Sequence, residues 1–198
     1  NSETISCNEN GYYPIDKSDR YGLNNDDYLW DIKSIDILIV GDSYGYGECV
    51  KRKDNFASNI SNLGRYNIIN LSYGGNGPLI EYATLREFSP LRFNKLLWFF
   101  SESNDLSDLE NELHNEILNK YFTDNFFSQN LKLISNKATN DLKKKLIKKW
   151  KDSKQKSSFI KSLNYIQLLK LFKTRRLFIK EKTYTPLNEL EEVIQKTK

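Results

Sequence analysis

An apolar run from Ile35 to Val40 ends abruptly at Gly41-Asp42-Ser43, and this junction constrains the fold more than any other part of the chain. A continuous β-branched run bounded by turn residues is typical of a strand in the middle of a parallel sheet. In such sheets the chemistry takes place just beyond the carboxyl ends of the strands. The sequence therefore places Ser43 either as a nucleophile or in a phosphate-binding loop.

A phosphate-binding loop requires different residues. A P-loop ends in Lys-Ser or Lys-Thr, and the dinucleotide fingerprint spaces its glycines as G-x-G-x-x-G. Here no lysine stands at the turn, and Gly41, Gly45 and Gly47 follow the spacing G-x-x-x-G-x-G. The pattern favours a nucleophilic serine.

Two later segments repeat the pattern of a strand followed by a polar loop. Residues 66–72 lead into Tyr-Gly-Gly-Asn-Gly-Pro, and residues 95–100 lead into Ser-Glu-Ser-Asn-Asp. Because parallel strands carry their carboxyl ends at one edge of a sheet, we expect both loops to lie near Ser43. The loop residues of interest are Gly75, Asn76, Asn104 and Asp105.

In this order the three segments resemble the SGNH (GDSL-type) hydrolase superfamily. Its blocks are a Gly-Asp-Ser after the first strand, an Asn-x-x-x-x-Gly loop, and a Gly-x-Asn-Asp after a later strand. The third block departs from the pattern, since residues 102–105 read Glu-Ser-Asn-Asp where a glycine usually precedes x-Asn-Asp. The resemblance implies that Ser43 is the nucleophile, and that its N–H, the N–H of Gly75 and the amide of Asn104 form an oxyanion hole. Further residues expected at the substrate are Asp42, Asn76 and Asp105.

These residue types suit acyl transfer. The reaction builds negative charge on a carbonyl oxygen, and each fixed donor aimed at that oxygen is worth on the order of 3 kcal/mol. Glycine at position 75 allows a close backbone approach, and Asn104 supplies a neutral NH₂ donor that Asp105 could orient.

A segment before the first strand extends the resemblance. Residues 19–30 read Asp-Arg-Tyr-Gly-Leu-Asn-Asn-Asp-Asp-Tyr-Leu-Trp, which closely resembles a bacterial subgroup of the superfamily, so that the likeness runs from about residue 12 to about residue 180. Asn24 and Asn25 are the residues outside the three blocks that we most expect to face the site.

The general base is missing from the sequence pattern. The family takes its histidine from an Asp-x-x-His block, whereas the one histidine here, His114, follows Asn111 in an acidic, helix-like run. A solvated imidazole on a helix face explains His114 better than a displaced base. Because the chain also begins at Asn1 and contains no methionine, we expect it to be the N-terminal and central part of a larger protein.

We therefore expect a three-layer α/β/α domain with a flavodoxin-like parallel sheet of SGNH type and its first strands in the order 2-1-3. It should span residues 1–131, with the C-terminal part of the sheet missing. Residues 132–198 should form a basic helical segment that packs on this domain or extends from it. The composition, 38% hydrophobic and 13% aromatic, is that of a globular chain.

The resemblance implies serine-dependent ester hydrolysis or O-acyl transfer on a small ester, for example an acylated carbohydrate. We expect the chain as given to be inactive for lack of the histidine, and the larger protein to be active. The alternative is a non-catalytic binding or scaffold protein that has kept a degenerate SGNH site as a ligand pocket.

Charge is distributed unevenly along the chain. The net charge is −9 over residues 1–131 and +14 over residues 132–182, where residues 140–150 and 157–170 place apolar side chains on one helical stripe and lysines opposite. Such helices could contact an anionic membrane surface or nucleic acid. We favour packing on the acidic domain and expect no nucleic-acid partner, because no nucleic-acid motif accompanies the charge. No run is long and apolar enough for a transmembrane segment, and the oligomeric state stays open.

Two cysteines, Cys7 and Cys49, are too few for a disulfide framework. One bridge and two free thiols are both open at this stage. The spacing is not that of a zinc site, and we expect no metal or cofactor. The compartment, extracytoplasmic or cytoplasmic, also stays open.

Overall fold

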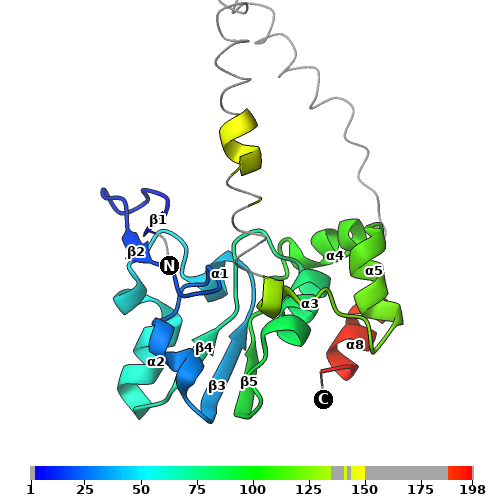
Figure 1. Ribbon diagram of the computed structural model, residues 1–198, viewed down its shortest axis with the longest axis horizontal. Coiled ribbons are helices and arrows are strands. Elements are labelled where there is room, and N and C mark those ends of the chain that lie inside the picture. Colours follow the sequence, from blue (N-terminus) through cyan, green and yellow to red (C-terminus); the bar gives the residue numbers. More distant parts are fainter. Residues whose placement is uncertain (1–2, 135–140, 142–143, 150–186, 198) are drawn as a thin grey trace, which may run out of the picture. The chain divides into compact units, whose positions relative to one another are not determined.

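The computed structural model describes residues 3–134, 141, 144–149 and 187–197 (Figure 1). In chain order its elements are β1 (Glu3–Ile5), β2 (Ile15–Lys17), η1 (Asp27–Asp31), β3 (Ile35–Val40), α1 (Ser43–Tyr46), η2 (Arg52–Asp54), α2 (Phe56–Gly64), β4 (Ile68–Asn70), α3 (Pro78–Phe88), β5 (Phe93–Trp98), α4 (Asp105–Leu113), α5 (Glu116–Thr123) and α8 (Leu187–Gln195). The chain divides into two compact units, residues 1–132 with 185–198, and residues 133–184.

The first unit is a mixed α/β fold built on a parallel sheet of three strands in the order β4-β3-β5. This is the predicted 2-1-3 order. β3 is paired on both sides, so its apolar residues are buried, whereas the first half of β5 is exposed at the sheet edge. The continuous apolar run of β3 therefore reflects a central strand.

Helices cover both faces of this sheet (Figure 1). On one face Ile37 and Ile39 of β3 pack with Ala57 and Ile60 of α2. On the other face, side chains of the same strands pack with α3 and with residues 21–32. The buried side chains on that other face are Leu23, Ile35, Leu38, Val40, Ile69, Leu71 and Leu85. The alternation of β3 side chains between two apolar layers gives the three-layer arrangement.

A further apolar cluster joins the helices outside the sheet. Leu79 and Tyr82 of α3 pack with Leu109 of α4 and with Val193 of α8. The last helix of the chain therefore belongs to the first unit, although residues 133–184, which form the second unit, precede it in sequence. Val193 is fully buried, which anchors α8.

An antiparallel hairpin of β1 and β2 precedes the sheet, and the sequence pattern did not predict it. A disulfide bond between Cys7 and Cys49 joins this hairpin region to the loop after α1. The structure thus resolves the choice that composition left open between a bridge and two free thiols.

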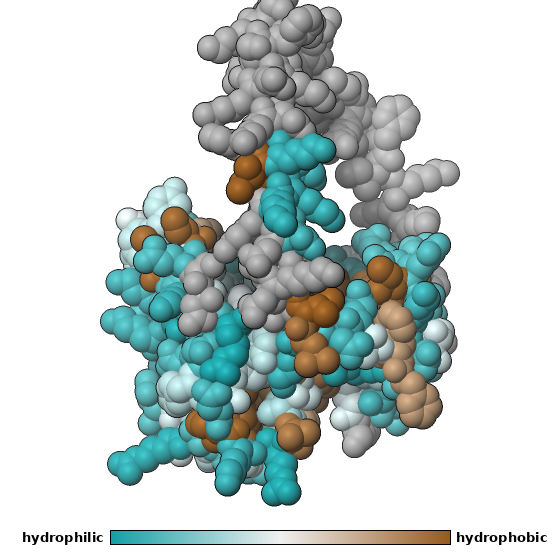
Figure 2. Space-filling view, in the orientation of Figure 1, coloured by the Kyte–Doolittle hydropathy of each residue, from teal (hydrophilic) through white to brown (hydrophobic). Residues whose placement is uncertain are grey.

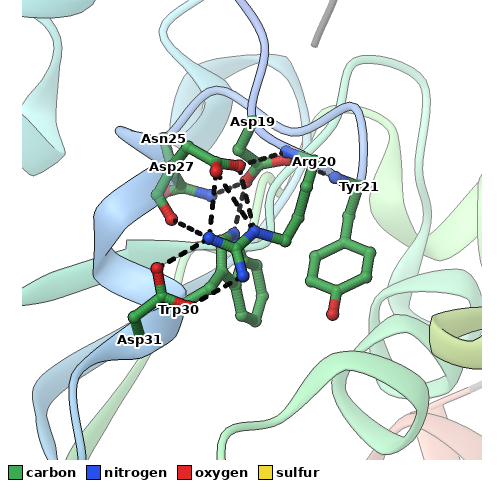
Figure 3. Close-up of polar contacts among 7 residues, drawn as sticks. All are labelled: Asp19, Arg20, Tyr21, Asn25, Asp27, Trp30 and Asp31. Carbon is green, nitrogen blue, oxygen red and sulfur yellow. Dashed lines mark hydrogen bonds and ion pairs between the residues drawn. The ribbon is translucent and has the colours of Figure 1, made fainter.

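Residues 19–31 are held in place by buried polar contacts (Figure 3). The carboxylate of Asp19 accepts the N–H of Tyr21 and Leu23 at 2.9 Å, the Asn25 amide at 2.9 Å, and Trp30 Nε1 at 2.8 Å. At the surface of this segment Arg20 pairs with two carboxylates, those of Asp27 and Asp31. The segment is thus ordered by hydrogen bonds to one buried carboxylate together with the packing of Leu23 in the core.

The second unit is described only at a few positions. Residues 144–149 are helical, and Leu146 and Ile147 are 56% and 55% exposed. The rest of both predicted amphipathic stripes lies outside the described residues, so their burial stays a prediction. Among the helices that the structure describes, none is long and apolar enough to cross a membrane. Figure 2 shows hydrophilic residues over most of the coloured surface on one face, with smaller hydrophobic patches between them.

Candidate active site

The loops that follow the three sheet strands meet at one edge of the sheet. The N–H of Tyr73 donates to the carbonyl of Gly41 at 3.1 Å, and the N–H of Phe99 donates to the carbonyl of Val40 at 2.9 Å. The three segments singled out in the sequence are therefore neighbours at this edge.

Helix α1 packs closely against the loop after β4. A Cβ atom at Gly45 would lie 2.5 Å from Ser72 Oγ, and Asn70 Nδ2 donates to the carbonyl of Gly45 at 2.7 Å. Only glycine fits this approach of helix and loop. The contact fixes the position of α1, and with it the position of Ser43, the first residue of the helix.

Asp42 is the N-cap residue of α1. It is buried, and its Oδ1 accepts the N–H of Tyr44 at 2.9 Å. This is the local turn contact that Asp favours. Asp42 therefore shapes the turn that carries Ser43, whose own side chain is half-buried.

Ser43 lies in the wall of a surface hollow of about 700 Å³. Other parts of its wall come from the loop after α1 and from the N-terminal segment, which the disulfide bond brings together. They include Cys7, Glu9, Tyr44, Glu48 and Asn55. A second hollow of about 420 Å³ adjoins it at Tyr44 and Phe56, and its wall includes Asp42, Ser101 and Glu102.

The loop after β4 has the backbone conformation that its glycines predict. Gly75 is exposed and has φ +81°, a left-handed conformation that favours glycine. Asn76 donates its N–H to the carbonyl of Tyr73 at 3.3 Å, within the same turn. A Cβ atom at Gly74 would lie 2.8 Å from Glu48 Oε2, so the Glu48 carboxylate lies against this loop.

Asn104 lies at the start of α4 with its side chain engaged on both sides. Its Oδ1 accepts hydrogen bonds from Ser101 Oγ at 2.7 Å and Ser103 Oγ at 3.1 Å, and its Nδ2 donates to Asp108 Oδ2 at 2.9 Å. The carboxylate that orients the amide is therefore Asp108, one helical turn on, and the expectation that Asp105 does so was wrong. An NH₂ group carries two hydrogens, and the bond to Asp108 uses one of them. The second is the one that an oxyanion would need.

Asp105 is fully buried behind the site. Its Oδ2 accepts the N–H of Ser101 at 2.6 Å, and its other oxygen has no partner in the described part of the chain. Burial raises the pKa of Asp105 to about 6, and the nearby Asp42 carboxyl adds to the rise. Because Asp105 has no exposed surface, its contact is with the backbone of the loop after β5, which it holds in place through Ser101.

Glu81 of α3 is a second buried carboxyl in the same region. One oxygen accepts a hydrogen bond from Trp98 Nε1, and the other has no partner among the described residues. Burial raises the pKa of Glu81 to about 9, since the Trp98 hydrogen bond offsets it only in part and Asp105 raises the pKa further. At neutral pH this group is therefore protonated and neutral.

His114 ends α4 at the surface, where its Nδ1 lies 2.7 Å from the carbonyl oxygen of Glu110 in the same helix. It is not among the residues that form the wall of either hollow in the described part of the chain. Its environment is that of a solvated imidazole at a helix end.

The structure brings some of the expected residues together more closely than others. Ser43 shares its hollow with neither Gly75 nor Asn104 among the residues described there. Asn24 and Asn25 are buried and bonded to other parts of the fold: Asn24 Oδ1 accepts Arg52 Nε at 2.9 Å, and Asn25 contacts Asp19. Both asparagines therefore support the fold.

Apart from Ser43, none of the wall residues of this hollow is among the site residues that the sequence predicts; those with charged or amide side chains include Glu9, Glu48, Asp54 and Asn55. The segment of Glu9 is held beside the loop after α1 by the disulfide bond and by hydrogen bonds of Cys49 with Ser6 and Asn10. Glu48 stands directly after the glycines of the first block, and this adjacency was the one available signal. The sulfur atoms of the disulfide and the Glu9 carboxylate lie within 4.8 Å of one another, but bonded sulfurs cannot act as thiolate ligands for a metal.

Comparison of the chain with protein-family models, with curated proteins and with solved structures gives no match.

Proposed function

We propose that this chain carries the nucleophile and part of the oxyanion hole of a serine-dependent ester hydrolase or O-acyltransferase of SGNH type, and that its sheet is of the corresponding flavodoxin-like type. The observation that carries the proposal is the position of Ser43. It begins the helix that follows the central parallel strand, in the wall of a hollow of about 700 Å³.

In the proposed reaction Ser43 Oγ bonds to the carbonyl carbon of an ester while its proton passes to an imidazole base. The ester C–O bond then breaks, and the alcohol leaves with that proton. Water or an acceptor hydroxyl repeats the sequence on the acyl-serine and releases the acid or a new ester. The N–H groups of Ser43 and Gly75 and the second amide hydrogen of Asn104 are the proposed oxyanion donors.

His114 is not the proposed base, because its ring contacts its own helix backbone. The resemblance assigns the role of general base to the histidine of an Asp-x-x-His block. An unactivated serine hydroxyl is a weak nucleophile at neutral pH. The chain alone should therefore hydrolyse esters slowly, and a base supplied from solution should help it.

The test combines a missing-base experiment with detection of the acyl-enzyme. The chain, its Ser43→Ala variant and a matched Ser34→Ala variant at an exposed serine are incubated with p-nitrophenyl acetate and increasing imidazole. We expect acetylation of the Ser43 peptide, measured by mass spectrometry, to rise with imidazole in the chain and in Ser34→Ala. Absence of Ser43 acetylation at every imidazole concentration would overturn the proposal.

One observation favours the second candidate, a non-catalytic binding protein. The Asn104 amide is already engaged with Asp108, and the described wall of the Ser43 hollow holds no histidine. A protein of this kind would bind ligand with equal affinity in the native and Ser43→Ala forms and would never become acylated.

A further inference from the structure

The charged residues in the described wall of the Ser43 hollow are all negative. Three of its wall residues, Glu9, Glu48 and Asp54, are carboxylates, and no lysine, arginine or histidine is among its described wall residues. A hollow that concentrates one sign of charge attracts ligands of the opposite sign.

The basic residues next to this hollow line a different one. Within the short helix η2, Asp54 lines the Ser43 hollow, whereas Arg52 and Lys53 line a separate hollow of about 650 Å³ on the β4 side. Arg52 is also held there by Asn24 and by Asp26. The negative character of the Ser43 hollow therefore comes from how the fold separates neighbouring residues.

Aromatic faces complete the wall. Tyr44 and Phe56 are 68% and 52% exposed and both line the hollow, although Phe56 also contacts Phe99 with ring centres 5.3 Å apart. An aromatic face attracts ammonium groups even at an exposed site. Exposed rings beside carboxylates are the combination that recognises a protonated or quaternary amine.

A buried polar atom supplies an independent sign of a ligand. Asn55 is 2% exposed and stands between the two hollows, in the wall of each, and its Oδ1 caps α2 by accepting the N–H of Ser58 at 2.9 Å. Its Nδ2 has no partner in the described part of the chain. A buried donor without a partner has lost its hydrogen bonds to water, and an oxygen acceptor on a ligand would replace them.

Glu48 links the charge to the proposed chemistry. Its carboxylate lies against Gly74, next to the proposed donor Gly75. A negative charge there disfavours an oxyanion, and a bound cation beside Glu48 would neutralise it.

We propose that the Ser43 hollow binds a small amino alcohol, a ligand that carries a cationic amine together with a hydroxyl or ether oxygen. The amine lies among Glu9, Glu48 and Asp54 and against the exposed rings, and the oxygen accepts from Asn55 Nδ2. In terms of the proposed function, which this inference extends, the ligand is the alcohol part of the ester.

Binding is measured by NMR titration of the Ser43→Ala chain, so that turnover does not interfere. The probes are glucosamine and choline, which are cationic, N-acetylglucosamine, which is neutral, and glucuronate, which is anionic. We expect the preferred cation to bind at least about tenfold more tightly than the neutral sugar. Its binding should weaken as salt is added and should shift the Asn55 side-chain amide resonance. Whichever cation binds more tightly identifies an amino sugar or a quaternary amine as the source.

Matched variants locate the effect. Glu48→Gln should weaken cation binding by roughly two- to fivefold and leave the neutral sugar unchanged, as expected for an exposed charge pair. Glu116→Gln, at an exposed acid of α5 outside the hollow, should change neither. Circular dichroism checks that each variant is folded.

The outcomes separate the two proposals. Equal binding of cationic and neutral probes, or cation binding that Glu48→Gln does not change, would overturn the inference, whether or not Ser43 becomes acetylated in the imidazole experiment. Selective cation binding without acetylation of Ser43 would support the inference and count against the esterase proposal.

Discussion

Asn25 and Asn70 exchange two hydrogen bonds across 45 residues of sequence. Asn25 Nδ2 donates to the carbonyl of Asn70 at 2.9 Å, and the N–H of Asn70 donates to Asn25 Oδ1 at 2.7 Å. Asn70 is the last residue of β4, which lies at the edge of the sheet. The Asn25 side chain therefore pairs with the N–H and the carbonyl of Asn70 as a neighbouring strand would. Both residues are buried, and water cannot replace these bonds.

Asn25→Ala should therefore destabilise the fold by about 3 kcal/mol, because it leaves two backbone groups of Asn70 without buried partners. The expected loss is roughly 6–12 °C in Tm. Asn25→Asp should cost at least as much, since its new carboxylate would face that of Asp19. Thermal unfolding followed by circular dichroism measures both, with the exposed Asn62→Ala as the control, and an alanine variant whose Tm equals that of the parent would refute the edge-strand role.

Glu81→Gln should remove the loss of folding stability that ionisation of the buried Glu81 carboxyl causes as the pH rises. The pKa of Glu81 is raised in the folded state from 4.5 to about 9, mainly by burial, so the folded state holds this proton more tightly than the unfolded state does. The stability that protonated Glu81 contributes to the folded state is fully present below pH 4.5 and is lost as the pH rises through 9. The free energy of unfolding of the variant should equal that of the parent near the acidic end of this pH window. At the alkaline end it should be higher than that of the parent by a few kcal/mol.

Urea unfolding of the parent and of Glu81→Gln at several pH values provides this measurement. Glu102→Gln, at an exposed acid, serves as the control. Parallel pH profiles for Glu81→Gln and the parent would show that Glu81 titrates normally in the fold.

The double variant Cys7→Ser/Cys49→Ser should lose about 4 kcal/mol of stability by the chain-entropy account of a cross-link over 42 residues. Reductant should lower the Tm of the parent to that of the variant. The variant itself should not respond to reductant, and that comparison separates loss of the bond from other effects of reducing conditions.

Glu112→Ala should destabilise the start of α3 by about 2–3 kcal/mol. The Glu112 carboxylate reaches from α4 to accept the N–H groups of Gly77 at 2.8 Å and Leu79 at 2.9 Å, which have no partner in the first turn of a helix. Glu112→Gln, which keeps one acceptor oxygen, should lose about half as much. Hydrogen exchange at the Leu79 amide reports the local effect, and unchanged protection in the alanine variant would contradict it.

Strand order and loop positions could be predicted because they depend on local patterns. The run that became β3 carries apolar residues on both faces, which only a central strand can bury, and turn residues mark where each strand ends. The position of Ser43 follows from these two facts. Gly75 likewise takes the left-handed conformation that its residue type allows.

Other features depend on contacts between distant segments, which local patterns do not encode. Two cysteines alone cannot show whether they pair. Asp108 and Asp105 both follow Asn104 within one helical turn, and only the helix geometry decides which of them meets the amide. Asn24 and Asn25 were expected to face the site because their segment is rich in Asp and Asn. Both are buried instead, and the segment is held by hydrogen bonds to Asp19 and by the packing of Leu23 in the core.

The Cys7–Cys49 bond joins the N-terminal hairpin region to the loop behind Ser43. Because the chain has two cysteines, this is the one bridge that can form within a single chain, and any other pairing joins two chains. The cross-linked peptide pair survives denaturation and protease digestion. Its yield from the monomeric fraction therefore reports how much of a preparation carries the bridge, so a silent activity assay on bridged protein can be told apart from one on reduced or intermolecularly linked chains.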